Sequence, residues 1–291
     1  MVGFMSGLIK GFKEAIIPTV LIVVVPTTFL GFLLSGGNIS QFFFKALPLI
    51  VLLDCCANVI NNYSDWEIDV INKKRPTMHR VFKKGHLLLT YFLFLPAIAA
   101  IMLASATSIY LWIIIGLCIL AGLFYSTFVK LKDALLINYA AIAVSYSVLA
   151  FAIGFFSGSS DLAHFWSLSP IWVFLMLVYF GYSMTKDYPD IIGDKMHGRR
   201  TLPVVFGKDL AIKIQYTTIT LAYVYLGLMV FLRLLGVSFL LLFVSYILAI
   251  RICMTISKTG STEKLLAMHY KSQQNALVAL VIIIILVLLH L

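Results

Sequence analysis

The sequence predicts an all-α integral membrane protein, and two observations carry that prediction. Hydrophobic residues make up 62% of the 291 residues and charged residues only 12%, with a mean hydropathy of +1.02. Apolar runs of about 20 residues, which is the length that crosses a bilayer as a helix, recur between short polar gaps. A soluble globular protein is therefore excluded. The chain is expected to form one transmembrane domain over residues 1–291.

Hydropathy divides the chain into nine predicted transmembrane helices. They cover residues 15–35, 42–61, 87–105, 109–129, 134–157, 166–186, 211–232, 236–256 and 274–291. The first contains Pro18 and Pro26, which neighbouring helices can accommodate within a membrane. The fourth ends in aromatic residues and lysines, as interface anchors do, and the fifth carries Asn138, an amide expected to bond another helix. The sixth is aromatic, and the last three are largely apolar.

The basic residues follow the predicted topology. Nearly all lysines and arginines lie in the N-terminal segment and in every second gap between spans. Because such loops stay in the cytoplasm, the N-terminus is expected there and the C-terminus outside, in a multi-pass protein of the cell (inner or plasma) membrane. The net charge of +10 then reflects topology and anionic lipid, and no nucleic-acid partner is expected. The four cysteines form no Cys-x-x-Cys pair, so a zinc site is not expected.

A polar stripe runs along the end of the second predicted span. Asp54, Asn58, Asn61, Asp65 and Asp69 are offset by 0, 4, 7, 11 and 15 positions, which places them on one side of a helix. Acidic residues at membrane depth are costly and usually face a protein interior or a wet cavity. For Asp54, a hydrogen bond to a neighbouring helix is the preferred interpretation, ahead of a role in catalysis.

A second acidic cluster, Asp187, Asp190 and Asp194, follows the sixth predicted span. Its offsets of 0, 3 and 7 also favour one helix face, although Pro189 should bend or end the helix. Both clusters belong to the predicted cytoplasmic side. Together they hold six of the twelve acidic residues: Asp65, Glu67, Asp69, Asp187, Asp190 and Asp194.

Carboxylates gathered in this way repel one another unless cations bind among them. Oxygen ligands without paired histidine or cysteine suit Mg²⁺, which takes one or two carboxylates and completes its shell with phosphate oxygens. Basic residues follow both clusters and could contact the remaining phosphate oxygens. The pattern predicts a magnesium-bridged diphosphate site beside an apolar, aromatic chamber. Ionisation of an allylic diphosphate there would give a carbocation that aromatic faces stabilise and from which water must be excluded.

Two sequence motifs carry a family resemblance. Asn61-xxx-Asp65-xxx-Asp69 followed by Lys73-Lys-Arg-Pro76 resembles the first motif of the UbiA superfamily of membrane prenyltransferases. The segment from Lys186 to Asp194, with Gly198-Arg-Arg-Thr-Leu-Pro-Val204 after it, resembles the second motif. Its residues are more similar to those of the chlorophyll, homogentisate and geranylgeranylglyceryl-phosphate branches of the superfamily than to those of the haem O branch. The segment Arg75-Pro-Thr-Met-His-Arg80 departs from the Ser-Gly pair that many members have there, which leaves the acceptor open.

The resemblance implies nine transmembrane helices around a central cavity, with both aspartate motifs facing the cytoplasm. It also implies Mg²⁺-dependent transfer of an isoprenyl group from an isoprenyl diphosphate to an aromatic or other lipophilic acceptor. Carried over by position, the catalytic residues are Asp65, Asp69, Asp187, Asp190 and Asp194. The metal ligands are these five and Asn61, and the diphosphate contacts are Arg75, Tyr125, Lys130 and Lys186.

Two alternatives remain open at this point. A terpene cyclase of the same superfamily would use the same site and quench the cation internally, without an acceptor. A cation transporter could use the acidic stripes as a relay, but it leaves the Gly-Arg-Arg-Thr-Leu-Pro-Val segment unexplained. Product analysis separates the first alternative from a transferase, and ion flux without release of diphosphate would indicate the second.

Overall fold

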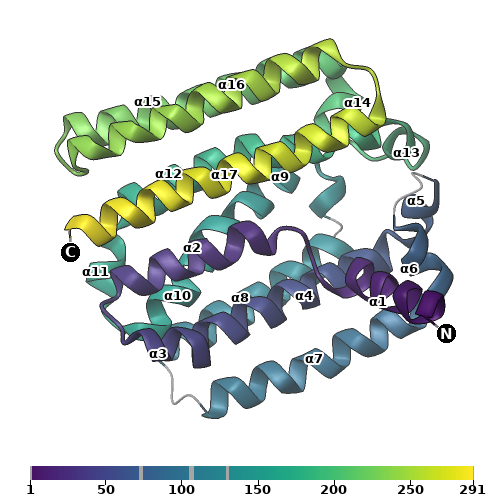
Figure 1. Cartoon of the computed structure of the whole chain (residues 1–291), viewed down its shortest axis with the longest axis horizontal. Helices are drawn as coiled ribbons and strands as arrows, with labels where there is room; N and C mark the ends of the chain where they lie inside the picture. The colour runs from purple at the N-terminus through teal and green to yellow at the C-terminus, as the bar shows by residue number, and fades with distance from the viewer. Residues whose placement is uncertain (1, 72–74, 105–107, 129–130, 291) are drawn as a thin grey trace.

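The computed structural model describes the chain except for residues 1, 72–74, 105–107, 129–130 and 291. Every regular element of the described residues is helical, which confirms the predicted all-α class. Figure 1 shows the long helices lying side by side as a bundle, with the two chain termini at opposite ends of it.

The bundle consists of long helices joined by short helical segments. The longer helices are α1 (Val2–Ile16), α2 (Leu21–Leu34), α4 (Leu47–Ser64), α7 (Lys84–Ala104), α8 (Ile109–Leu123), α9 (Leu135–Val144), α10 (Ala150–Gly158), α12 (Ser169–Ser183), α15 (Lys208–Phe231), α16 (Phe243–Lys258) and α17 (Thr262–His290). The short α-helices are α3 (Ile39–Gln41), α5 (Trp66–Ile71), α6 (Pro76–Val81), α11 (Leu162–Ser167), α13 (Ile191–Met196) and α14 (Leu202–Phe206). Wider or tighter turns form η1 (Phe42–Ala46), η2 (Phe124–Phe128), η3 (Leu131–Asp133), η4 (Ser145–Leu149), η5 (Met184–Lys186), η6 (Tyr188–Asp190) and η7 (Val237–Leu242).

Seven helical stretches of the described residues are long and apolar enough to cross a membrane. They are Ile39–Ser64, Lys84–Ala104, Ile109–Thr127, Leu135–Gly158, Lys208–Phe231, Val237–Lys258 and Thr262–Leu289. Met5–Ile16 and Leu21–Leu34, bent by 54° relative to each other, would together make an eighth. The chain is thus a multi-pass membrane protein, but the predicted count of nine spans is not confirmed.

The difference from nine arises at the first and sixth predicted spans, and proline accounts for the first. Pro18 has no N–H to donate and restrains the residue before it, so α1 ends at Ile16 and the chain turns before α2 begins. The sixth predicted span, 166–186, contains α12, which is only 15 residues long. Beyond Ser183 the chain tightens into the 3₁₀ turns η5 and η6, the second of which contains Pro189.

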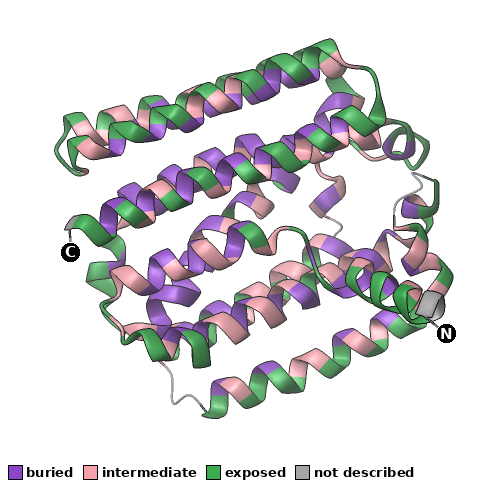
Figure 2. Cartoon of the chain, viewed as in Figure 1, coloured by how far each residue is buried: buried purple, intermediate pink, exposed green. Residues whose placement is uncertain are grey.

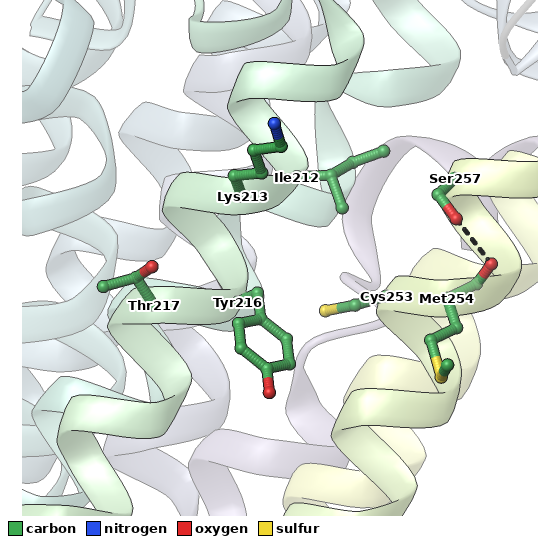
Figure 3. Close-up of a pocket in the computed structure, with 7 residues that line it drawn as sticks. All are labelled: Ile212, Lys213, Tyr216, Thr217, Cys253, Met254 and Ser257. Atoms are coloured by element: carbon green, nitrogen blue, oxygen red, sulfur yellow. Dashed lines mark hydrogen bonds between the residues drawn. The ribbon is translucent and has the colours of Figure 1, made fainter.

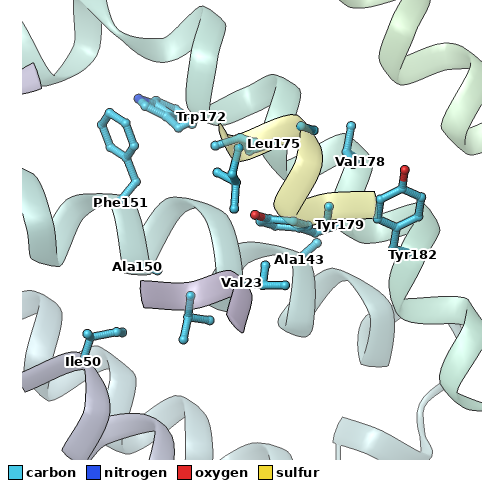
Figure 4. Close-up of a cluster of buried hydrophobic side chains, with 14 of the residues drawn as sticks. Val23, Ile50, Ala143, Ala150, Phe151, Trp172, Leu175, Val178, Tyr179 and Tyr182 are labelled. Carbon is cyan, nitrogen blue, oxygen red and sulfur yellow. The ribbon is translucent and has the colours of Figure 1, made fainter. Parts of the chain in front are cut away.

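Helix α12 lies in the interior of the bundle. It packs against α9, α15 and α17, and the Tyr179 hydroxyl shares a 3.0 Å hydrogen bond with the Thr27 hydroxyl of α2. Figure 4 shows Trp172 and Tyr179 of α12 directed toward Phe151 of α10 and Val23 of α2. The aromatic content of this segment therefore serves the core of the bundle.

Helices α2 and α10 approach each other closely, through glycine on both sides. A Cβ at Gly154 would lie 1.8 Å from the Thr28 carbonyl oxygen, and one at Gly31 would lie 2.1 Å from the Phe151 carbonyl oxygen. Small residues allow membrane helices to approach at this distance and to gain dispersion contacts that lipid cannot supply. The two helices are therefore locked together at one crossing.

The outer surfaces of α7, α15 and α16 are largely exposed (Figure 2), and many of the exposed residues are apolar. Exposed side chains there include Leu89, Phe92 and Leu93 of α7, Leu221 and Val224 of α15, and Val244 and Ile247 of α16. Side chains of this kind can face lipid hydrocarbon without a free-energy cost, because lipid tails are as apolar as they are. The exposed surface is that of a membrane protein.

The end of the bundle that carries α5, α6, α13 and α14 is called the polar end here (Figure 1). Helix α5 contacts α13, which brings together segments that follow α4 and α12. Helix α6 packs on α1, where the Glu14 carboxylate accepts a 2.8 Å hydrogen bond from the Met78 amide. These contacts place both aspartate motifs at one end of the molecule.

Candidate active site

Asp65 ends helix α4 and binds two cations. Its amide bonds the Asn61 carbonyl oxygen at 2.8 Å, and α5 begins at the next residue, Trp66. The Lys132 ammonium lies 2.7 Å from Asp65 Oδ1 and 2.9 Å from Ser64 Oγ, with only 5% of the lysine side chain exposed. An Arg199 guanidinium nitrogen donates to the same Oδ1. Asp65 therefore holds a lysine from η3 and an arginine that follows α13.

Arg199 joins the two aspartate motifs. Besides Asp65, its guanidinium lies 3.0 Å from Asp133 Oδ1 and 3.5 Å from Asp194 Oδ1. Gly198 makes this geometry possible, because its φ of +69° is the left-handed conformation that commonly ends a helix. The Arg199 amide then bonds the Asp194 carbonyl oxygen at 2.9 Å, and the side chain turns back over α13. One guanidinium thus links carboxylates 129 positions apart in the sequence (194 minus 65).

The charges in this cluster support one another. Burial alone would raise the pKa of Asp65, but Lys132 and Arg199 outweigh it and hold that pKa below its ordinary value. Burial by itself would lower the pKa of Arg199. The carboxylates of Asp65, Asp133 and Asp194 raise that pKa by more than burial lowers it, so the guanidinium remains charged. Asp65 is an anion at neutral pH and Arg199 a cation.

Asp69 is buried one helical turn beyond Asp65, on α5, and forms an ion pair with Arg75. Arg75 has φ and ψ of 48° and 48°, the left-handed conformation, directly before Pro76 opens α6. This conformation costs a non-glycine residue about 1–2 kcal/mol. The ion pair helps to hold Arg75 in that conformation and directs its side chain into the polar end.

A second basic cluster forms around Lys186. Its ammonium donates to the Tyr125 hydroxyl at 2.8 Å and to Asn138 Oδ1 at 2.9 Å, and Tyr125 donates to the same Asn138 oxygen at 2.6 Å. The ammonium also lies 5.6 Å from the centroid of the Tyr125 ring. Two predicted diphosphate contacts, Tyr125 and Lys186, are therefore adjacent, and Asn138 makes the expected bond to another helix.

The remaining acids of the second motif lie beside this cluster. Asp187 is buried and accepts a 2.5 Å hydrogen bond from the Tyr139 hydroxyl, which in turn accepts one from the Leu202 amide at 3.0 Å. Asp190 is half-buried in η6, and its amide bonds the Asp187 carbonyl oxygen at 3.1 Å. Asp194 on α13 is buried, with Thr201 at 3.5 Å.

The other predicted site residues differ in what the structure says of them. Asn61 is half-buried on α4, one turn before Asp65. Lys130 lies outside the described residues. Lys132 and Arg199 were not predicted as site residues, because their charges fitted the positive-inside pattern equally well. The available signal was the polar pair Lys132-Asp133 and the glycine directly before Arg199.

The oxygen-rich side chains of the polar end match the ligand preference of Mg²⁺. In the described part of the chain, no group of three or more His, Cys, Asp or Glu side chains could hold a metal ion. Mg²⁺ commonly needs only one or two carboxylates, because phosphate and water complete its octahedron. Asp65 and Asp194, which already share the charge of Arg199, fit that requirement.

A separate surface pocket lies between α15 and α16. It measures about 380 Å³ and is lined by Ile212, Lys213, Tyr216, Thr217, Cys253, Met254 and Ser257. Figure 3 shows side chains of both helices facing one another across it. It contains none of the acidic residues described above, so it is distinct from the candidate active site.

Removing the guanidinium should destabilise the polar end. Arg199→Ala leaves buried Asp65 and Asp194 carboxylates without a shared partner, and breaking a buried ion pair in this way costs about 3–5 kcal/mol. Arg199→Lys should lose part of this, because an ammonium cannot reach three carboxylates as the planar guanidinium does. The thermal midpoint of the purified protein in detergent measures both. Equal midpoints for wild type and Arg199→Ala would contradict the structural role.

Fold and site together define an all-helical, multi-pass membrane protein with two aspartate-containing segments joined at one end of its bundle. The chain belongs to the UbiA prenyltransferase family, whose model matches residues 24–271. The family membership confirms the resemblance that the two sequence motifs carry.

Individual relatives agree with this placement. The chain is 28% identical over 186 residues to digeranylgeranylglyceryl phosphate synthase of Methanospirillum hungatei, covering 60% of this chain and 61% of that protein. It is 29% identical over 202 residues to the bacteriochlorophyll synthase 34 kDa chain of Chloroflexus aurantiacus, covering 66% of this chain and 60% of that protein. The matches therefore span less than two thirds of either relative.

Solved structures share the fold. A structure described as digeranylgeranylglyceryl phosphate synthase superposes with a TM-score of 0.67 at 22% identity, covering 95% of this chain and 97% of that one. A UbiA homologue from Archaeoglobus fulgidus bound to GPP and Mg²⁺ gives a TM-score of 0.67 at 15% identity, covering 93% and 99%. At these identities the likeness concerns the fold.

Proposed function

We propose that this protein is a Mg²⁺-dependent membrane prenyltransferase. It moves an isoprenyl group from an isoprenyl diphosphate to an aromatic or other lipophilic acceptor. The observation that carries the proposal is the shared contact of Asp65 and Asp194 with Arg199, which unites both aspartate motifs in one polar site. A site of this kind directly beside an aromatic bundle interior suits a ligand with a charged head and an apolar tail.

In the proposed reaction, the bond between C1 of the isoprenyl group and the diphosphate oxygen breaks, and its electron pair leaves with diphosphate. A nucleophilic atom of the acceptor forms the new bond to C1 and loses a proton. Mg²⁺, held by Asp65 and Asp194 and by Asn61, Asp69, Asp187 and Asp190 around them, would neutralise the leaving group.

The basic residues and the bundle interior complete the site. Lys186 and Arg75, with Tyr125 beside Lys186, bind diphosphate oxygens by charge-assisted hydrogen bonds. Lys130 is proposed for the same role on its position in the sequence alone. Aromatic side chains of the bundle stabilise positive charge on the isoprenyl group and exclude water that would otherwise trap it.

The names of two relatives bear on the proposed class of acceptor. The names of the two relatives, digeranylgeranylglyceryl phosphate synthase and bacteriochlorophyll synthase, belong to two of the branches that the second motif resembles. The first name refers to a lipid and the second to a pigment. These names support a lipophilic acceptor for the present chain. Whether that acceptor is aromatic is for experiment to decide.

Product analysis tests the proposal. Purified protein in lipid nanodiscs receives Mg²⁺, a mixture of isoprenyl diphosphates and a panel of phenolic and lipid acceptors, and products are identified by mass spectrometry. A prenylated acceptor with release of one diphosphate per product is expected. A cyclic hydrocarbon formed without acceptor, or no consumption of any isoprenyl diphosphate, would contradict the proposal.

Removal of divalent metal should stop the reaction. Treatment with EDTA is expected to reduce diphosphate release to background, because the carboxylates then repel the anionic substrate. Addition of excess Mg²⁺ should restore it, and the same amount of K⁺ should not. Undiminished release in EDTA would show that the acidic residues have another role.

The polar end is further proposed to face the cytoplasm, with the whole chain acting as a single transmembrane domain. Basic residues concentrate at this end, among them Lys84, Lys132, Lys186 and Arg199, as the positive-inside rule requires. A protease-cleavable tag at the N-terminus tests the orientation in sealed vesicles. Cleavage from the cytoplasmic side alone is expected.

A further inference from the structure

Asp54 is an acidic residue of the bundle that the site described above does not use. It lies within the membrane-spanning part of α4, and its Oδ2 atom is buried with no hydrogen-bond partner among the described residues. The helix–helix hydrogen bond preferred from the sequence is therefore not found for this oxygen. An unpaired polar atom at membrane depth costs free energy, which indicates that a partner from outside the chain satisfies it.

The neighbours of Asp54 show which way it faces. Its carboxylate lies within electrostatic range of Cys118 on α8 and Tyr146 in η4. Tyr146 is also within electrostatic range of Tyr125, which binds Lys186. Because these neighbours belong to α8 and η4, the Asp54 carboxylate faces the interior of the bundle rather than lipid.

The side chain of Asp54 and two of the tyrosines near it are not completely enclosed by the bundle. Asp54, Tyr125 and Tyr146 are each partly accessible, although all three belong to membrane-spanning stretches and lie among neighbouring helices. Tyr146 is within electrostatic range of both Asp54 and Tyr125, and Tyr125 accepts a hydrogen bond from Lys186, so Asp54 and the Lys186 cluster belong to the same region of the bundle. A ligand bound at Lys186 could therefore have a neighbour in contact with Asp54.

Helix geometry sets the depth of Asp54. It precedes Asn61 by seven residues on the same helix, a separation of about 10 Å along the helix axis. Asp54 is therefore too far from Asn61 to bind the same diphosphate.

We propose that Asp54 binds the remote end of the acceptor. The acceptor it recognises is lipophilic, carries a hydroxyl or amine there and has no negative charge at that depth. This inference rests on the proposed function and deepens it. Asp54 acts in acceptor recognition and takes no part in bond making. A hydrogen bond from the acceptor satisfies the unpaired oxygen, and an anionic group in the same place would be repelled.

Three phenols of similar shape test the inference: tyramine, 4-hydroxybenzyl alcohol and 4-hydroxybenzoate. They place a cationic, a neutral and an anionic group opposite the phenol. Binding of each is measured by calorimetry on the full chain in nanodiscs, loaded with Mg²⁺ and geranylgeranyl thiolodiphosphate, which resists ionisation. The wild type is expected to bind the amine and the alcohol at least about tenfold more tightly than the benzoate.

Asp54→Asn is the decisive variant, because it keeps the size of the side chain and removes its charge. It should lose about tenfold or more in affinity for tyramine and gain affinity for 4-hydroxybenzoate, while the thiolodiphosphate binds as in the wild type. Asp209→Asn, which removes an exposed carboxylate at the start of α15, is the matched control and should change none of these affinities. Unchanged thiolodiphosphate affinity also shows that the Asp54 variant is folded.

The outcomes separate this inference from the proposed function. Failure of the wild type to bind the thiolodiphosphate would refute the proposed function itself. With thiolodiphosphate bound, three results would overturn the role of Asp54: no binding of any phenol, preference for the benzoate, or the wild-type order retained in Asp54→Asn.

Discussion

Asp65→Ala and Asp190→Ala are each expected to reduce prenyl transfer by at least about 10²-fold, the loss typical when a positioned charged group is removed from an active site. Asp65 holds Lys132 and Arg199 in the polar end, and Asp190 lies between Asp187 and Asp194 in the second motif. Without either carboxylate, the proposed Mg²⁺ loses a ligand or the diphosphate loses its orientation. Diphosphate release from membranes containing equal amounts of each variant measures the effect.

Glu67→Gln is the matched control for this prediction. Glu67 lies between Asp65 and Asp69 in the sequence, but its side chain is 62% exposed and forms an ion pair with Lys84 at the surface. An exposed pair of this kind contributes about 0–1 kcal/mol, so the variant should keep its activity and stability. Full activity in Asp65→Ala or Asp190→Ala would reject the site, and loss of activity in Glu67→Gln would extend it to the surface.

Gly154→Ala is expected to be the most damaging small substitution in the bundle. The added methyl group would meet the Thr28 carbonyl oxygen at 1.8 Å, and backbone cannot move aside as a flexible side chain can. Overpacking of this kind costs about 1–3 kcal/mol and sometimes more. The expected result is a lower thermal midpoint and a smaller monodisperse fraction on size-exclusion chromatography in detergent.

Gly227→Ala on α15 is expected to have the opposite effect on stability. A Cβ at Gly227 meets nothing within 4 Å, so alanine there should stabilise the helix by about 0.5–1 kcal/mol. If both substitutions shifted the midpoint equally, the effect at Gly154 would come from helix propensity rather than from the contact between α2 and α10.

The membrane class and the composition of the site could be predicted because they depend on local pattern. A run of apolar residues long enough to cross a bilayer indicates a helix wherever it occurs, and six such stretches begin and end within three residues of their predicted bounds. The last stretch was predicted from residue 274 but begins at Thr262, because its first turns are polar. The offsets of the two aspartate motifs placed each set of carboxylates on one side of a helix or turn. The sequence likewise points to Tyr125, Asn138 and Lys186, which the fold brings into contact.

Partner choice could not be predicted, because it depends on distances between segments far apart in the chain. Lys132 and Arg199 stood in basic loops that membrane topology explained equally well, and only the fold shows that both contact Asp65. The unpaired oxygen of Asp54 could not be predicted for the same reason, because a missing partner can be recognised only when the positions of all neighbouring residues are known.

The sequence alone determined a helical membrane protein with two acidic motifs, whose carboxylate and amide oxygens suit the proposed magnesium diphosphate site. Only the tertiary structure decided that Arg199 joins these motifs and that Asp54 faces the interior without a partner. The physical reason is that hydropathy and helical periodicity act within a single segment. Ion pairs and unsatisfied polar atoms depend instead on which segments meet.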